Sequence, residues 1–404
     1  MPKRKEDESI LKYRQLTYGE CTREEDLKYL AKKTKIDQTS LLQELSFLHT
    51  MTSSLVPLMF QLLESDIPMK FKMIAYKKIL ALEKEQTGKL HQWVDAFLRI
   101  PFQKDIPLAV KFNQKDQCHV FMKECETILD QCTYGMRDAK QQFLQLIGKW
   151  VVNPSSMGTA IALKGPMGTG KTTLIKHGIS KILNRPFAFI TLGGAADGSF
   201  LEGHSYTYEG STYGKIVDIL IQSKASNPVI FFDELDKVSP SEKGSEVIGI
   251  LTHLIDTTQN TQFHDKYFSE LDFDLSKCLF VFSYNDESLV NPILRDRMFT
   301  IEVPGYDKHE KTIIARDYLI VEIEKEYCMK DIQWKEEVIE YLIEKTEQES
   351  GVRNLKRSLD TIYSKLNLER ILNTSFTFPY EMTCSKIDEW FPTLEKTSYH
   401  SMYL

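Results

Sequence analysis

A glycine-rich segment between an apolar run and a helical run constrains the possible folds of this chain more than any other feature. Residues 165–172 read GPMGTGKT and match the pattern G-x-x-x-x-G-K-T in full. The run AIALK precedes them, and the helical segment TTLIKHGISKIL continues from them. A glycine-rich turn in this context lets backbone N–H groups surround phosphate oxygens, and the following helix directs its positive end at them. The segment therefore predicts a P-loop on a parallel α/β sheet.

Short β-rich runs on either side of the P-loop support the same fold class. They alternate with helical segments between Tyr134 and Val303. The runs are Ala160–Leu163, Phe187–Thr191, Val229–Asp233, Leu279–Ser283 and Phe299–Val303. This alternation is typical of a parallel sheet with helices on both faces. We expect this α/β domain to span residues 119–305.

Helical patterns flank the α/β region on both sides. Residues 1–118 contain few glycines and no alternating strand pattern, and Asp66 to Leu98 carry apolar residues at helical spacing. After Pro304-Gly305 the chain again has helical segments, which predict a small helical lid over residues 306–404. These helical segments are Lys308–Lys325, Lys335–Thr346 and Gly351–Leu372. A chain of 404 residues has room for two or three such domains.

Two acidic residues at the end of one strand complete the candidate nucleotide site. Asp233 and Glu234 follow the apolar run 229–232, and ligands lie at this carboxyl end in parallel sheets. We expect Asp233 and Thr172 to hold Mg²⁺, and Glu234 to orient and deprotonate the attacking water. The P-loop residues expected to bind ATP are Gly165, Pro166, Met167, Gly168, Thr169, Gly170, Lys171, Thr172 and Thr173, with the Lys171 charge between the β- and γ-phosphates.

Three further polar residues fit phosphoryl-transfer chemistry by their order along the chain. Asn285 ends a strand run, where an amide can align the water or bind the γ-phosphate. Arg297 can stabilise the transferring charge, and Arg353 opens a helix from which it can reach the γ-phosphate. Taken singly, these residues are better read as a strand-end turn residue, a surface arginine and a helix-start salt bridge. The phosphoryl-transfer interpretation rests on their order and spacing.

Longer stretches of this chain resemble the ATPase part of Lon-type AAA+ proteases. The resemblance runs from about Asp66 to about Leu372, with a helical collar from about residue 66. It includes YGMRDAK, GPMGTGKTTL, TLGG, GHSYTYEGSTYGKI, NPVIFFDELDK, DLSKCLFVFSYN, LRDRM, PGYDKHEK and GVRNLKR. It implies that Asn285 is sensor 1, that Arg297 is an arginine finger reaching a neighbouring subunit, and that Arg353 is sensor 2. It also implies that Tyr134 and Gly135 hold the adenine. A finger acting on a neighbour implies a ring, which is a hexamer in this family.

The same resemblance places a substrate-gripping pore loop around Tyr208. The family has an apolar residue after this aromatic residue, whereas this chain has Glu209. A carboxylate weakens a grip that depends on a bulky, dry side chain. Tyr206 and Tyr213 are candidates to compensate, and the alternative is that these tyrosines only pack in a surface loop.

The resemblance does not extend to a peptidase. Lon proteases carry a serine–lysine dyad, and residues 372–404 contain nothing similar to its glycine-flanked serine segment. We therefore expect ATP-driven remodelling or translocation of an unfolded protein substrate without intrinsic peptidase activity. A nucleic-acid motor or loader is one alternative, although a net charge of −6 provides no basic field for nucleic acid. The other alternative is an ATP-binding assembly or regulatory subunit of a ring.

Cysteine spacing and hydropathy bear on metals and on location. Cys118, Cys125 and Cys132 are seven residues apart, which favours a core stripe on one helix face over a metal site. The chain has no C-x-x-C pair, and its longest apolar stretch, Leu55 to Leu63, is too short to span a bilayer. We expect a soluble intracellular protein, cytoplasmic or nuclear and not secreted. Lys3-Arg4-Lys5 is either a nuclear address or a solvated terminus.

Overall fold

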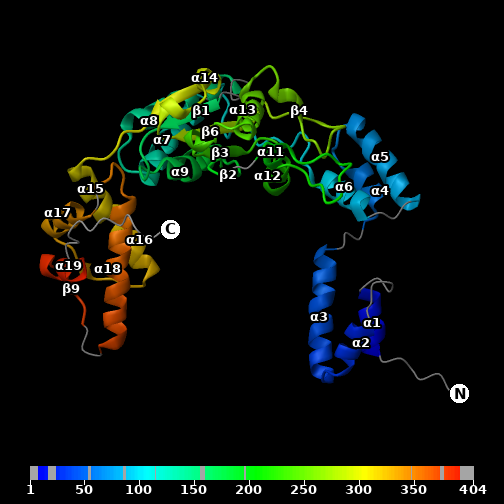
Figure 1. Ribbon diagram of the computed structural model, residues 1–404, viewed down its shortest axis with the longest axis horizontal. Coiled ribbons are helices and arrows are strands. Elements are labelled where there is room, and N and C mark those ends of the chain that lie inside the picture. Colours follow the sequence, from blue (N-terminus) through cyan, green and yellow to red (C-terminus); the bar gives the residue numbers. More distant parts are fainter. Residues whose placement is uncertain are drawn as a thin grey trace. The chain divides into compact units, whose positions relative to one another are not determined.

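The structure is a computed structural model in which the chain forms two compact units, Met1–Leu98 and Arg99–Leu404 (Figure 1). It describes residues 8–16, 24–52, 56–84, 88–113, 115–154, 160–194, 197–346, 348–373 and 377–391. Lys3-Arg4-Lys5 and the last residues of the lid prediction, 392–404, lie outside these ranges.

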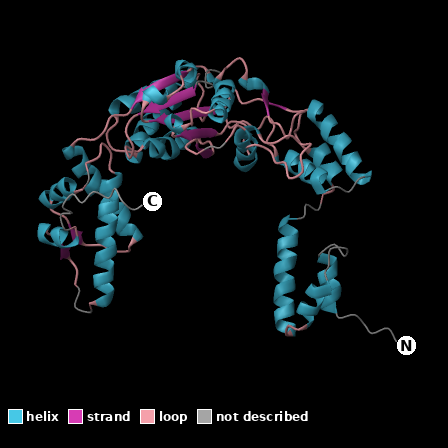
Figure 2. Cartoon of the chain, viewed as in Figure 1, coloured by secondary structure: helices cyan, strands magenta, loops and turns pink. Residues whose placement is uncertain are grey.

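The described residues of the first unit form helices, as the sequence predicts (Figure 2). The helices are α1 (Glu8–Leu16), α2 (Glu24–Ala31), α3 (Lys35–Thr52), α4 (Leu58–Glu64), α5 (Met69–Lys84) and α6 (Gly88–Arg99). Helix α6 shows why this region is helical: it buries Leu90, Trp93, Val94 and Phe97, which recur at a spacing of three or four residues. The Trp93 and Phe97 rings stack with their centroids 5.2 Å apart.

The second unit contains the predicted parallel sheet. Its strand order is β2-β3-β6-β1-β7, and every neighbouring pair is parallel. The strands are β1 (Ala160–Lys164), β2 (Phe187–Thr191), β3 (Val229–Asp233), β6 (Leu279–Tyr284) and β7 (Met298–Glu302). Strands β1, β3 and β6 are buried along almost their whole length, which explains their continuous apolar sequences. The predicted α/β fold is confirmed.

Alternate strand residues point to opposite faces of this sheet. Ile161, Phe231 and Val281 join one core cluster with helices α7 (Lys115–Cys132) and α8 (Arg137–Val152). The helix after the P-loop joins the same cluster; it comprises α9 (Lys171–Thr173), a π-helical segment (Leu174–Ile179) and α10 (Ser180–Leu183). On the other face the Phe232 and Phe282 rings stack at 4.8 Å. The cysteine stripe of α7 also faces the core: Cys125 is a member of the cluster, and Cys118 and Cys132 pack against it.

Connecting segments complete the α/β layer. They contain α11 (Ser199–Glu202), α12 (Lys215–Ser223), α13 (Glu242–Ile255), α14 (Pro292–Asp296) and an antiparallel pair of β4 (Phe263–His264) and β5 (Asp272–Phe273). The sequence did not indicate β4 and β5, because two residues are too few to show alternation.

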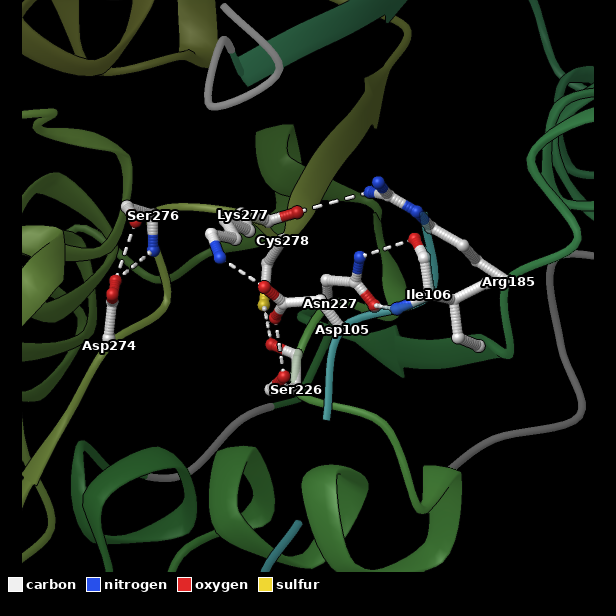
Figure 3. Close-up of polar contacts among 9 residues, drawn as sticks. All are labelled: Asp105, Ile106, Arg185, Ser226, Asn227, Asp274, Ser276, Lys277 and Cys278. Atoms are coloured by element: carbon white, nitrogen blue, oxygen red, sulfur yellow. Dashed lines mark hydrogen bonds and ion pairs between the residues drawn. The ribbon is translucent and has the colours of Figure 1, made fainter. Parts of the chain in front are cut away.

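A strap formed by residues 100–113 is bound to the loops that precede β3 and β6 (Figure 3). Asn227 holds it by two 2.9 Å hydrogen bonds: its side-chain oxygen accepts from Ile106 N–H, and its amide donates to the Ile106 carbonyl. The Ser226 hydroxyl donates to Asp105 at 2.6 Å, and Lys277 pairs with the same carboxylate. These contacts lie at the amino ends of the strands and leave the carboxyl ends open.

The helical lid has its own core. It comprises α15 (Lys308–Ile314), a π-helical segment (Ala315–Leu319), α16 (Ile320–Glu326), α17 (Glu336–Lys345), α18 (Arg353–Leu372) and α19 (Cys384–Trp390). Asp307 and Glu310 form a capping box that starts α15. Leu359, Ile362 and Tyr363 of α18 are fully buried in the lid core. A short parallel pair, β8 (Ile332–Gln333) with β9 (Tyr380–Glu381), was not predicted from the sequence.

Candidate active site

Strand register brings the P-loop and the candidate catalytic residues to one edge of the sheet. Lys164 of β1 lies opposite Tyr284 of β6, so the residues that follow, Gly165 and Asn285, leave the sheet side by side. The Gly165 N–H donates to the Tyr284 carbonyl at 3.1 Å. Phe232 of β3 lies opposite Phe282 of β6, which places Asp233 beside Ser283. The carboxyl ends of β1, β3 and β6 therefore form one polar edge of the sheet, called the ledge below.

The Lys171 ammonium lies at the centre of this ledge. It donates to the carbonyls of Gly165 and Pro166 and to the Asn285 side-chain oxygen, the last at 3.0 Å. The side chain is buried, and burial lowers the pKa of the Lys171 ammonium to about 8, although the charges of Asp233 and Asp236 act against the decrease. The ammonium thus stays beside the P-loop backbone and within reach of an anion bound there.

The start of the lid helix packs directly on the P-loop. Gly168 has a φ of +75°, and a Cβ there would lie 3.1 Å from the Arg353 Cβ, so both the backbone conformation and the close approach favour glycine. The Val352 N–H donates to the Gly168 carbonyl at 3.2 Å. A Cβ on Gly351 would lie 2.2 Å from the Met167 carbonyl oxygen. This contact sets Arg353 at the P-loop although it lies far along the chain.

The acidic pair is held in a defined geometry. The Ser283 hydroxyl donates to the Asp233 carboxylate, which also accepts from the Glu234 N–H at 3.1 Å. Glu234 has a φ of +61°, an uncommon left-handed conformation for a non-glycine residue. A Cβ on Gly193 would lie 2.2 Å from the Glu234 carboxylate oxygen, so Gly193 makes room for this carboxylate.

One cavity of about 720 Å³ joins these groups, between the sheet edge and the lid. Most of the predicted nucleotide-site residues line it: Tyr134, Met167, Gly168, Thr169, Gly170, Lys171, Thr172, Thr173, Asp233, Glu234, Asn285 and Arg353. Gly165 and Pro166 contribute through the carbonyls that accept from Lys171. Gly135 adjoins Tyr134 with a φ of +64°. The volume is in the range of small-molecule and cofactor sites.

Comparisons with known proteins agree with this geometry. Residues 161–305 match the family described as ATPase family associated with various cellular activities (AAA). A Lon protease homolog of Acanthamoeba polyphaga mimivirus is 37% identical over 297 residues, covering 71% of this chain and 28% of the relative. The Lon protease of Fusobacterium nucleatum subsp. nucleatum is 35% identical over 286 residues, covering 70% of this chain and 36% of the relative. The chain carries a Lon-like AAA+ module. It spans well under half the length of these curated relatives.

The donor set of the Lon-like module fits Mg²⁺ with a nucleotide. The Thr172 hydroxyl and the Asp233 carboxylate present hard oxygen ligands beside the P-loop, and Mg²⁺ normally takes one or two protein ligands besides phosphate oxygens and water. Among the described residues, no group of three or more His, Cys, Asp or Glu side chains is arranged to hold a metal ion by itself. None of the helices in the described ranges is long and apolar enough to cross a membrane.

Arg297 is the one predicted phosphoryl-transfer residue that lies outside the cavity. Its guanidinium pairs with Asp256 at 3.3 Å and is partly exposed. Asp256 in turn accepts from the N–H and the hydroxyl of Thr258, at 2.9 and 2.7 Å. Within one chain of the Lon-like module, Arg297 therefore does not face the P-loop.

The loop of residues 204–213 carries Tyr208, the residue predicted to grip the substrate of the Lon-like module. Tyr208 is 69% exposed, and Glu209 beside it is exposed as well. Tyr206 and Tyr213 behave differently, because both rings make edge contacts with Tyr267, at 5.4 and 6.1 Å. These contacts hold both rings against Tyr267 and favour the alternative that Tyr206 and Tyr213 pack in the loop, whereas Tyr208 projects from it.

The sequence analysis missed three residues that shape the site. Ser283 contacts Asp233, Gly193 borders Glu234, and the Tyr306 hydroxyl donates to the Thr169 carbonyl at 2.7 Å. Tyr306 and Gly193 lie in the segments PGYDKHEK and TLGG, which carry part of the resemblance, so a signal for both was present. Ser283 lies in the segment DLSKCLFVFSYN, but its contact with Asp233 depends on the pairing of β3 with β6, which the segment does not indicate.

Proposed function

We propose that this Lon-like AAA+ module hydrolyses ATP as an oligomeric ring, a hexamer by the pattern of the family, and that turnover drives remodelling or translocation of unfolded protein. The observation that supports this most strongly is the single cavity lined by Lys171, Asp233, Glu234 and Arg353. We assign residues 119–305 to the α/β ATPase domain and 306–404 to the lid. No peptidase step is attributed to these 404 residues.

Each side chain at the cavity has a proposed task. Lys171 neutralises phosphate charge, and Glu234 orients and deprotonates the attacking water. Asn285, held by the Lys171 ammonium at 3.0 Å, aligns that water or the γ-phosphate. Thr172 and Asp233 hold Mg²⁺, which supplies charge neutralisation at the phosphate oxygens. Arg353 binds from the lid, so that loss of a phosphate changes the contact between lid and sheet.

An ATPase assay with and without an unfolded protein tests this function. We expect the polypeptide to stimulate turnover, and Tyr208→Ala to reduce that stimulation at least about threefold, because an exposed aromatic ring supplies most of the apolar contact of the 204–213 loop. Thr207→Ala, an exposed change in the same loop, is the matched control. Stimulation by single-stranded DNA but not by polypeptide would favour the nucleic-acid alternative. Turnover insensitive to both would favour the assembly-subunit alternative.

Arg297→Ala is expected to lose turnover in a way that mixed rings can restore. The guanidinium lies outside the cavity of its own chain, so we propose that it completes the cavity of a neighbouring chain. We expect a decrease of about a thousandfold in uniform rings, the size typical of such arginines.

Mixing Arg297→Ala chains with Lys171→Ala chains should restore part of the activity, since each variant supplies what the other lacks. The measurement is the ATPase rate across mixing ratios. The exposed Arg295, two residues away, provides the control Arg295→Ala. Full activity from isolated wild-type monomers would contradict the proposal.

A further inference from the structure

The 204–213 loop stands on a narrow neck. Gly203 and Gly214 meet so closely at its base that a Cβ on Gly203 would lie 2.7 Å from the Gly214 nitrogen. A Cβ on Gly214 would lie 2.1 Å from the Leu201 carbonyl oxygen. Inside the loop, the His204 N–H donates to the Thr212 carbonyl at 3.1 Å. The two stems of the loop are thus in direct contact and enter the domain together.

Both stems are attached to one segment far along the chain, residues 264–268. The Lys266 N–H donates to the Glu202 carbonyl at 2.7 Å and so holds the first stem. The Asp265 carboxylate holds the second stem, because one of its oxygens accepts from the Gly214 N–H at 2.7 Å. Its other oxygen accepts from the N–H groups of Tyr267 and Phe268, at 2.8 and 3.1 Å. One side chain therefore joins the loop to the turn beneath it.

The surroundings of Asp265 make this contact costly to lose. Asp265 has no solvent exposure, and aromatic rings surround the turn: Tyr213 stacks on Phe268 at 6.0 Å, and Tyr206 contacts Tyr267. Burial raises the pKa of the Asp265 carboxyl to about 6, with a smaller contribution from the Glu202 charge, and the three N–H donors act in the opposite direction. A buried carboxylate is retained only where such donors satisfy it.

We propose that Asp265 is the positioning residue of the 204–213 loop: its carboxylate fixes the Gly214 stem to the 265–268 turn, so that Tyr208 is presented to polypeptide in one orientation. This inference rests on the proposed function of the loop, but the contact itself can be tested without it. The N–H groups of Gly214, Tyr267 and Phe268 require acceptors on both oxygens of the Asp265 side chain. An ionised carboxylate provides them, because it only accepts hydrogen bonds. An asparagine has the same shape, yet it must turn an N–H toward one of these donors.

The variant Asp265→Asn is therefore the primary test, measured by amide hydrogen exchange in the full chain. We expect exchange in residues 203–214 to accelerate roughly tenfold or more, because the Gly214 amide loses an acceptor that is charged in the native protein. Exchange in β1 and β6 should stay as in the wild type, which shows that the sheet is intact. The matched control is Asp274→Asn, an exposed aspartate in the same region that accepts from Ser276 N–H at 3.0 Å.

A second measurement tests whether the contact between Asp265 and the Gly214 N–H, called the clamp from here on, acts through Tyr208. Asp265→Asn should raise the polypeptide concentration for half-maximal ATPase stimulation about fivefold, since a loosened loop pays more entropy on binding. In the background of Tyr208→Ala, the same change should have no further effect. A general loss of structure would instead lower the basal and the polypeptide-stimulated ATPase rates further in this background.

The outcomes separate the clamp from the proposed function. Unchanged exchange in 203–214 would overturn the clamp, whatever the ATPase shows. Suppose that Asp265→Asn accelerates exchange but leaves ATPase stimulation unaltered, while Tyr208→Ala reduces stimulation. That result would overturn the positioning role alone. If Tyr208→Ala leaves stimulation unchanged, the proposed use of the loop is overturned. The exchange data would still test the contact between Asp265 and the Gly214 N–H. If Asp265→Asn unfolds the unit, Gly214→Ala displaces the same N–H by its Cβ and provides the exchange test.

Discussion

Replacing Lys171 with alanine is expected to weaken ATP binding at least a hundredfold, or roughly 3 kcal/mol. The ammonium is the cation at the centre of the P-loop, and it contacts Gly165, Pro166 and Asn285 from a buried position. Its removal takes away the point charge between the phosphates and also frees Asn285. Titration with a fluorescent ATP analogue at fixed ionic strength measures the change.

The control for this prediction lies on the same helix. Lys176 is exposed and faces away from the cavity residues, so Lys176→Ala removes an equal charge without touching the P-loop. We expect that variant to bind within about twofold of the wild type, because surface charges contribute little. An affinity of Lys171→Ala that stays within about threefold of the wild type would show that phosphate is bound elsewhere.

Replacing Glu234 with glutamine is expected to lower turnover by about a hundredfold or more while ATP still binds. Glutamine has nearly the same shape, so it fits the space that Gly193 leaves, but it cannot accept the proton of the attacking water. Asp233 and Lys171 remain in place, so the phosphate cradle is intact. We expect ATP to stay bound unhydrolysed and the ring to persist.

Single-turnover hydrolysis together with a mass measurement of the assembly in ATP tests this second prediction. Glu242→Gln, a change of the same type at the exposed start of α13, serves as its control. Turnover of Glu234→Gln within about twofold of the wild type would remove this carboxylate from the mechanism. Loss of ATP binding would instead indicate that its charge helps to build the site.

Local patterns were sufficient for the elements that build the sheet. The predicted run Val229–Asp233 coincides with β3, and the predicted start of β1, Ala160, is also observed. These strands are buried on both faces, so each is a continuous apolar run that sequence alone reveals. The helix predicted over Lys308–Lys325 is observed as α15 and α16 joined by a π-helical segment, which periodicity does not distinguish. Two-residue strands such as β8 carry no pattern and were missed.

The chemistry of residues within one motif could likewise be predicted from the sequence, whereas contacts between motifs could not. The GPMGTGKT segment and the acids that follow Phe232 indicate phosphate binding and water activation by their own composition. Their arrangement in one cavity depends on strand order. Ser283 reaches Asp233 across 50 positions of sequence, and Tyr306 reaches Thr169 across 137.

The amino-acid sequence by itself determined that this chain contains a P-loop sheet, a helical lid and an acid pair, because periodicity and motif chemistry are local properties. Only the tertiary structure decided that Gly193 borders the Glu234 carboxylate, that Arg297 lies apart from its own cavity, and that Asp265 joins the 204–213 loop to the domain. Each of these depends on which atoms of distant segments approach within a few ångströms. That proximity arises from packing between distant segments, which no short window of sequence records.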